Sequence, residues 1–158
     1  MNREIERKFL VVKPPPELNK YPNHRIEQGY IAVTDDLEVR LRKKGDQYYQ
    51  TVKSDGGLVR REVEIELSRD QFEALWPMTE GKRIEKTRYE IEYEGFLIEL
   101  DIYSGNLHGL KVAEVEFKTE DQSKTFIPPD WLGAEVTDDK RYKNKYLSLH
   151  GIPDCDIS

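Results

Sequence analysis

Cysteine is nearly absent from this chain, because its 158 residues include Cys155 and no other. A disulfide framework within one chain and a cysteine-based zinc site are therefore excluded. No apolar signal core follows Met1, and no hydrophobic run approaches the length of a membrane span. These absences predict a soluble cytoplasmic protein without a membrane partner.

An excess of positive charge is missing as well, because 25 Lys and Arg are set against 31 Asp and Glu, for a formal net charge of −6. No global basic field would attract nucleic acid or an anionic membrane, so neither is an expected partner. A small anion is not excluded, because a local cluster of Arg and Lys can outweigh a mildly negative total.

Three signatures of common enzyme chemistry are absent. The sequence contains neither the G-x-x-x-x-G-K-[ST] phosphate loop nor the G-x-S-x-G nucleophile turn. Its histidines, His24, His108 and His150, are scattered and do not have the spacing of a metal-binding pair. We therefore predict neither P-loop nor serine-hydrolase chemistry.

What the chain does contain is an alternation of charged and apolar residues. Charged residues make up 35% and hydrophobic residues 37%, a balance that alone would suggest disorder. Their order has a period of two, which is typical of half-buried strands. Short connections such as Gly45-Asp46 and Glu94-Gly95 are typical of antiparallel hairpins. The pattern predicts strands over residues 4–12, 25–33, 37–44, 47–54, 59–67, 83–93, 96–103 and 110–118.

Helices are predicted at three places. Ser68 with Gln71 forms a capping-box pattern, and Thr119 with Gln122 repeats it. A third helix is predicted to be capped by Thr137 or Asp138 and to run past Tyr142 and Tyr146 to Gly151. Another hairpin turn, at 55–57, is expected between the fourth and fifth strands.

The charged faces of these strands carry pairs at i and i+2 that are segregated by sign. Arg40 with Arg42 is a basic pair, for example, and Glu114 with Glu116 an acidic one. These stripes are either an ordinary solvated sheet surface or the lining of a closed barrel, and the segregation by sign favours the lining. We predict one α+β domain over residues 1–158, a closed eight-stranded antiparallel β-barrel whose outer apolar face is covered by a few helices.

Charges inside such a lumen are costly unless they are paired or solvated. Uncompensated acidic clusters require cations, and uncompensated basic clusters require anions. A divalent metal between carboxylates, bridging to a polyphosphate held by Arg and Lys, would satisfy both.

The motifs match, in order, those of a known family. The N-terminal EIERKFLV, with its Glu-x-Glu-x-Lys alternation, is followed by QGY at 28–30, VRLR at 39–42, TVKS at 51–54, EKTR at 85–88, ELD at 99–101, EVEF at 114–117 and DKRYKNK at 139–145. Together they resemble the CYTH, or triphosphate tunnel metalloenzyme, superfamily, and in particular its short bacterial inorganic triphosphatases. The resemblance implies an eight-stranded tunnel, Mg²⁺ or Mn²⁺, and hydrolysis of tripolyphosphate to pyrophosphate and phosphate. A homodimer is compatible with it.

The same resemblance implies which acidic and basic residues act. The acids that match its metal-binding pairs are Glu4, Glu6, Glu114 and Glu116, whose hard oxygen ligands suit Mg²⁺ or Mn²⁺. The cations expected to bind substrate are Lys8, Arg40, Arg42, Lys53, Arg60, Lys86, Arg88 and Lys140. Catalytic roles are expected for Lys8, Lys86, Glu62 and Glu64.

Several assignments keep two interpretations. Alternation with Glu62 favours Arg60 over Arg61 as the residue that faces the lumen. Tyr30 either acts as a gate against Lys8 or only packs. Lys140 either closes one tunnel mouth or belongs to a solvated helix face. Glu62, Glu64, Glu99 and Asp101 either orient the cations or help to activate water.

Other activities fit the same tunnel. A class IV adenylyl cyclase or a thiamine triphosphatase would need a pocket for an organic group, and no insertion that would build one is recognisable. A non-catalytic polyphosphate- or nucleotide-binding module would be expected to lack the acidic pairs, which are present here. We therefore expect hydrolysis of the bare triphosphate.

Overall fold

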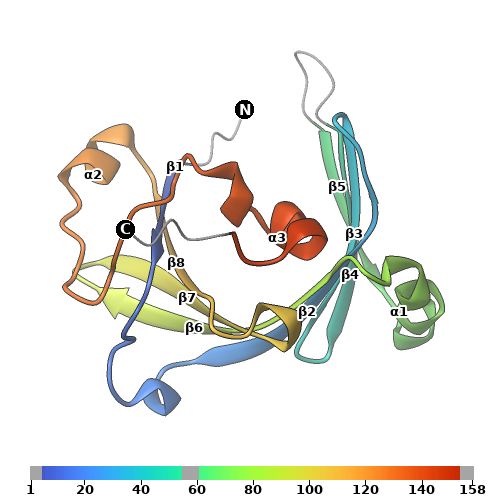
Figure 1. The fold of residues 1–158 in the computed structure, drawn as a ribbon, viewed down its shortest axis with the longest axis horizontal. Helices are drawn as coiled ribbons and strands as arrows, with labels where there is room; N and C mark the ends of the chain where they lie inside the picture. The colour runs from blue at the N-terminus through green and yellow to red at the C-terminus, as the bar shows by residue number, and fades with distance from the viewer. Residues whose placement is uncertain (1–4, 55–60, 154–158) are drawn as a thin grey trace.

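The computed structural model describes residues 5–54 and 61–153, in which eight strands form one antiparallel sheet (Figure 1). The sheet order is β1-β8-β7-β6-β2-β3-β4-β5. The strands are β1 (Ile5–Leu10), β2 (Asn23–Val33), β3 (Leu37–Lys44), β4 (Gln47–Ser54), β5 (Arg61–Leu67), β6 (Arg83–Tyr93), β7 (Phe96–Ser104) and β8 (Lys111–Phe117). Each predicted strand is present. The bounds of β3, β4 and β6 are the predicted ones, and the other strands differ from the predicted bounds by one or two residues at one or both ends.

All the strand pairs of the sheet are antiparallel, as the short hairpin connections predict. Gly45 in the β3–β4 turn and Gly95 in the β6–β7 turn have positive φ angles of 57° and 83°, which suit glycine. The predicted turn at 55–57 lies outside the described residues. The β4–β5 pair is nevertheless antiparallel, with Thr51 opposite Glu64.

The sheet is strongly curved, with β1 and β5 at its two edges (Figure 1). Within residues 5–54 and 61–153 no pairing joins these two strands, so the closed barrel is not confirmed. The edge of β1 that closure would use is already hydrogen-bonded to residues 133–136. Gly133 N donates to Leu10 O at 2.7 Å, Leu10 N to Ala134 O at 2.8 Å, and Val136 N to Lys8 O at 2.8 Å.

Helices and 3₁₀ turns connect and cover the sheet. The described helices are α1 (Arg69–Leu75), α2 (Glu120–Thr125) and α3 (Asn144–His150), and the 3₁₀ turns are η1 (Leu18–Lys20), η2 (Trp76–Thr79), η3 (Gly105–Leu107) and η4 (Lys140–Tyr142). The capping box of Ser68 and Gln71 is present at α1. Among these described helices, none combines the length and apolar character that crossing a membrane requires.

The main core lies between the convex face of the sheet and the segment that follows α2. Phe126 is 6% exposed and sits among the rings of Phe9, Tyr93, Phe96 and Phe117, with centroids 5.3–6.5 Å away. These buried aromatic contacts hold the long connection 118–132 against β1 and β8. A smaller cluster under α1 covers β3 and β4 on the same convex side.

The last helix departs from the prediction in two respects. It begins at Asn144 and not after Thr137 or Asp138, because residues 140–142 form a separate 3₁₀ turn capped by Asp139. It also does not cover the outer face. Figure 1 shows α3 inside the curve of the sheet, and its Leu147 is 1% exposed. Leu147 clusters with Ile84, Tyr103 and Val112, which lie on the concave face. The C-terminal helix therefore fills one part of the concavity with apolar side chains.

We expect Phe126→Ala to lower the free energy of unfolding by about 3–5 kcal/mol, because it leaves a cavity between the sheet and its cover. Its neighbour Ile127 is 74% exposed, so Ile127→Ala is the matched control and should change stability by less than about 1 kcal/mol. Urea denaturation compares the two. Equal losses would contradict the assignment of this cluster as the core.

Candidate active site

Strand pairing places the predicted site residues on one face of the sheet. Side chains paired across neighbouring strands point to the same side, as do side chains two apart in one strand. Lys8 is paired with Glu114. Arg88 is paired with Asp101. The same alternation assigns to this concave face Glu6, Arg40, Arg42, Lys53, Glu62, Glu64, Lys86, Glu99 and Glu116.

The charges on this face are ordered by sign across the sheet. The outer strands β1, β8 and β7 on one side and β5 on the other carry most of the acids, with Glu38 on β3 and Glu90 on β6 as exceptions. The inner strands β6, β3 and β4 carry most of the cations. Between β6 and β3, strand β2 contributes the neutral Ile26 and Gln28. The centre of the concave face is therefore basic and its two edges are acidic.

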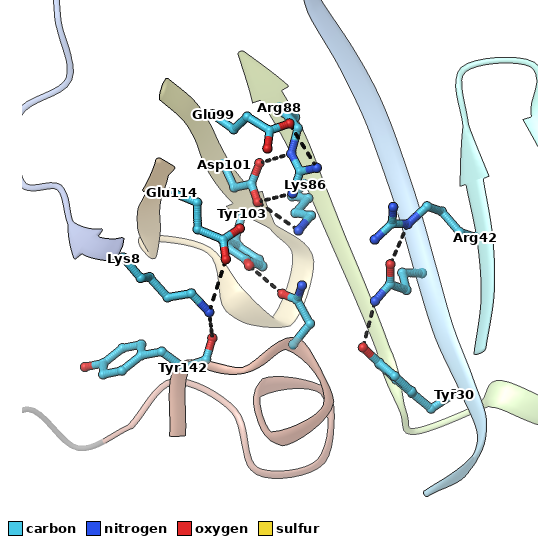
Figure 2. Close-up of polar contacts among 12 residues, drawn as sticks. Lys8, Tyr30, Arg42, Lys86, Arg88, Glu99, Asp101, Tyr103, Glu114 and Tyr142 are labelled. Carbon is cyan, nitrogen blue, oxygen red and sulfur yellow. Dashed lines mark hydrogen bonds and ion pairs between the residues drawn. The ribbon is translucent and has the colours of Figure 1, made fainter. Parts of the chain in front are cut away.

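Asp101 is the carboxylate that Lys86 and Arg88 of the basic centre share (Figure 2). Its carboxylate accepts two hydrogen bonds from Arg88, at 2.8 and 3.0 Å, and its Oδ2 lies 2.8 Å from Lys86 Nζ. Arg88 also lies 3.3 Å from Glu99. Burial alone would raise the pKa of Asp101, but the Lys86 charge and the Arg88 hydrogen bonds hold that pKa below its usual value.

Lys86 is fully buried, with an exposed fraction of 0%. Burial lowers its pKa to about 8, although Asp101 opposes the shift, and Arg88 and Arg42 lower the pKa further. Its ammonium lies 2.8 Å from Asp101 Oδ2, and no other acceptor is bonded to it in the described residues. An ammonium carries three donors, so this one has unused capacity.

Arg42 and Arg40 extend the basic centre onto β3. Burial and then the charges of Arg40 and Arg88 lower the pKa of Arg42 to about 10. Its Nε donates to Gln28 Oε1 at 2.7 Å, which leaves the other guanidinium nitrogens available. Arg40 pairs with Glu38 at 3.8 Å, and its buried Nε has no hydrogen-bond partner in the part of the chain that the structure describes.

Tyr30 is held in this same layer. It is 1% exposed and accepts a 2.7 Å hydrogen bond from Gln28 Nε2, and burial raises its pKa to about 12. The described residues show no contact of Tyr30 with Lys8, so the expected gate against that lysine is not seen. Tyr30 instead fixes the amide that orients Arg42 (Figure 2).

The acidic edge on β1 and β8 surrounds Lys8. Its ammonium lies 3.7 Å from Glu114 and donates to the carbonyl of Tyr142 at 3.3 Å (Figure 2). Glu6 is paired across the strands with Glu116, so two carboxylates are neighbours there. Among the described residues no group of three acids or histidines is gathered into a ready metal site. Glu4, the other expected ligand, lies outside them.

The opposite edge carries the remaining predicted residues. Lys53 lies 3.8 Å from Glu62. Thr51 donates to Glu64 at 3.1 Å. Arg61 is paired with Ser54 and therefore points to the convex side, away from the basic centre. Arg60, the residue favoured by alternation, lies outside the described residues.

The structure does not bring every expected residue into the cluster. Lys140 is exposed on η4, and no contact of its side chain with the basic centre is found in residues 5–54 or 61–153. The structure also adds three residues of the site that the sequence did not predict, namely Gln28, Tyr103 and Asn144. The Tyr103 hydroxyl donates to Asn144 Oδ1 at 2.6 Å. Only the alternation of the β2 and β7 strands could have placed Gln28 and Tyr103 on this face.

Comparison with known proteins adds a family and close relatives. The sequence matches the CYTH domain family over residues 2–142. It is 54% identical over 149 residues to an inorganic triphosphatase of Nitrosomonas europaea, which covers 92% of this chain and 97% of the relative. It is 41% identical over 150 residues to an inorganic triphosphatase of Acetivibrio thermocellus, covering 93% and 94% of the two chains. A crystal structure of an inorganic triphosphatase superposes with a TM-score of 0.80 at 49% identity, covering 97% of this chain and 98% of that one.

We expect Asp101→Ala to lower the free energy of unfolding by about 3–5 kcal/mol, because it leaves two buried cations without their shared carboxylate. Asp130 is exposed, so Asp130→Ala is the matched control and should be nearly neutral. Urea denaturation measures both. A loss below about 1 kcal/mol for Asp101→Ala would contradict its place as the shared carboxylate.

Proposed function

This chain belongs to the CYTH domain family, and on that premise we propose that it is an inorganic triphosphatase. Its substrate is tripolyphosphate, bound on the concave face of the sheet. Water attacks a terminal phosphorus, the bridging P–O bond breaks, and pyrophosphate and phosphate are released.

The observation that carries this proposal is the shortage of counter-charge in the basic centre. Arg40, Arg42, Lys86 and Arg88 are gathered from β3 and β6, and the buried carboxylate of Asp101 is shared by Lys86 and Arg88. Glu99 lies 3.3 Å from Arg88 and Glu38 lies 3.8 Å from Arg40, so three carboxylates face four cations. Burial, and after it the repulsion from neighbouring arginines, lowers the pKa values of Arg42 and Lys86. A bound polyanion would relieve that repulsion and occupy the unused donors.

The spacing of the cations suits a chain of phosphates. Side chains two apart in a strand are about 6.6–6.8 Å apart, and β3 lies two strand spacings, or roughly 9–10 Å, from β6. These separations are comparable to the length of a whole triphosphate, so cations on both strands could contact one substrate molecule. Arg88, Arg42 and Arg40 are partly accessible and would contact the phosphates, whereas Lys86 lies beneath them as a buried source of positive potential.

The acidic edge fits a divalent cation. Carboxylate oxygens suit Mg²⁺ or Mn²⁺, and Mg²⁺ usually takes one or two protein carboxylates together with water and substrate phosphates. Glu6 and Glu116, which are paired across β1 and β8, and the nearby Glu114 would hold it. The cation supplies charge neutralisation on phosphate oxygens and a lowered pKa for bound water.

The chain's own residues bind the substrate and stabilise its charge. Lys8 lies beside Glu114, where its ammonium can neutralise charge that develops on the leaving pyrophosphate. Lys53 extends the cations toward β5. Glu62 and Glu64, which contact Lys53 and Thr51, hold that part of the face in place rather than touching the reacting phosphorus.

A bare triphosphate is favoured over an organic one by the position of α3. A cyclase or thiamine triphosphatase must accommodate a base or a thiamine ring beside the phosphates. Here Leu147 and Tyr142 pack with Ile84 and Val112 and fill one part of the concavity. The names of the two relatives agree with this preference.

Turnover assays test the proposal directly. Purified protein is incubated with tripolyphosphate, ATP or thiamine triphosphate, with Mg²⁺, with Mn²⁺, or with chelator. We expect phosphate and pyrophosphate from tripolyphosphate only when metal is present. Cyclic nucleotide from ATP would overturn the substrate, metal-independent turnover would overturn the metal, and binding without turnover would indicate a non-catalytic module.

Arg88→Ala should lower kcat/KM for tripolyphosphate at least about 100-fold, because it removes a phosphate contact and unbalances Asp101. Arg61 points to the convex side, so Arg61→Ala is the matched control and should keep kcat/KM within about 2-fold of the wild type. A similar loss in both variants would contradict binding on the concave face. Circular dichroism shows whether each variant is folded.

The lowered pKa of Lys86, about 8, predicts proton uptake on binding. A polyanion nearby raises that pKa. At pH 8.5 the number of protons taken up on binding should therefore be larger for the wild type than for Lys86→Arg, by a large fraction of one proton. The arginine of the variant stays protonated throughout. Affinity should accordingly fall as the pH rises above about 8. Calorimetry of metal-free tripolyphosphate binding in two buffers measures the uptake. Equal uptake by both proteins would contradict the assignment to Lys86.

A further inference from the structure

The C-terminal segment reaches the site from inside the concavity (Figure 2). It contacts the side of Lys8 through the carbonyl of Tyr142, which accepts from Nζ at 3.3 Å. Through Asn144 it contacts Tyr103, which is the neighbour of Lys86 on β7. The Asn144 side chain accepts a hydrogen bond from the Tyr103 hydroxyl at 2.6 Å. The two lysines come from β1 and β6, which lie on opposite sides of β8 and β7. One segment therefore contacts Lys8 directly and contacts Tyr103, the neighbour of Lys86.

The backbone of β1 is bound to the same segment. Lys8 N donates to Thr137 Oγ1 at 3.0 Å, and Val136 N donates to Lys8 O at 2.8 Å. Thr137 in turn donates to Glu135 at 2.6 Å, and Glu135 forms a pair of hydrogen bonds with Arg7. Both the main chain and the side chain of Lys8 are therefore placed by residues near the end of the chain.

Tyr103 lies between Asn144 and Lys86. The two residues are paired across β6 and β7, and Lys86 Nζ lies 5.4 Å from the centre of the Tyr103 ring. The ring is 3% exposed, so its position is set by packing and by its one hydroxyl contact. A cation over an aromatic face is stabilised by the ring quadrupole, and the effect depends on the orientation of the ring.

We propose that the segment from Gly133 to Asn144 is a positioning element of the active site, with Asn144 acting on Lys86 through Tyr103. This inference rests on the proposed triphosphatase function. Asn144 does not touch the phosphates. It holds the ring on which the buried ammonium lies, and that ammonium lies beside Asp101, the carboxylate that orients Arg88.

The position of α3 itself does not depend on Asn144. Leu147 anchors the helix in the apolar cluster with Ile84 and Val112. Loss of the Asn144 amide should therefore leave the helix in place and change the site. A positioning role therefore predicts a changed site in a folded protein, whereas a purely structural role predicts a loss of folded protein.

Steady-state kinetics form the first arm of the test. Asn144→Ala and Tyr103→Phe should each raise KM for tripolyphosphate at least about 5-fold while kcat changes less than about 2-fold, because binding charge is displaced in a folded enzyme. The double variant should be no worse than either single one, since both remove the same hydrogen bond. Asn144→Asp keeps an acceptor and should restore most of the loss. Asn106 is exposed on η3, so Asn106→Ala is the matched control.

A second arm needs no turnover. The Lys86 side-chain carbon next to the ammonium is titrated by NMR in the ligand-free protein and assigned by its absence in Lys86→Arg. Asn144→Ala should lower the midpoint by about 0.5 pH unit, the size expected from a weakened cation–ring contact. The other groups that act on Lys86, Asp101, Arg88 and Arg42, are unchanged in these variants.

The two arms keep the possible failures apart. If the wild type neither binds nor hydrolyses tripolyphosphate, the proposed function fails, while the titration still decides whether Asn144 acts on Lys86. A fall in kcat alone would indicate a structural role and would overturn the proposal. An unchanged midpoint in both Asn144→Ala and Tyr103→Phe would overturn it as well.

Discussion

Repulsion between cations on one face of the sheet is the constraint on which the rest of the structure depends. Arg40, Arg42, Lys86 and Arg88 share a small area, and burial strengthens every interaction among them. Asp101 makes the arrangement tolerable in the ligand-free protein because it binds Arg88 through two hydrogen bonds and Lys86 through an ion pair. The compensation is incomplete, and the remaining positive potential is what a triphosphate would use. Stability and function are therefore opposed at this site, as is common where charge is gathered for catalysis.

The C-terminal part of the chain gives this charged face its shape. Residues 133–136 occupy the edge of β1, so the curved sheet remains open along that side within the described residues. Helix α3 then lies inside the curve and fills part of it with apolar side chains around Leu147. What is left is a basic centre between two acidic edges. The same segment contacts Lys8, so the fold and the site are stabilised together.

Much of this arrangement could be predicted from the sequence because a strand period of two is a local property. The alternation of Arg40 and Arg42, or of Glu114 and Glu116, correctly placed these side chains on a common face. The roles of individual residues came from the family resemblance and remain proposals. The edge pairing of residues 133–136, the inward position of α3 and the contact of Tyr103 with Asn144 could not be predicted, because they join segments far apart in the chain. The expected gate contact of Tyr30 with Lys8 was not seen for the same reason, since hydrophobic pattern does not specify which polar groups meet across strands.

The central claim is that the concave basic centre binds the triphosphate. A crystal structure of the protein with tripolyphosphate and Mn²⁺, with the metal located by its anomalous scattering, tests it most directly. We expect the phosphates to contact Arg40, Arg42 and Arg88, and the manganese to be bound by the carboxylates of β1 and β8. Phosphates bound on the convex face, or manganese held away from Glu6, Glu114 and Glu116, would contradict it.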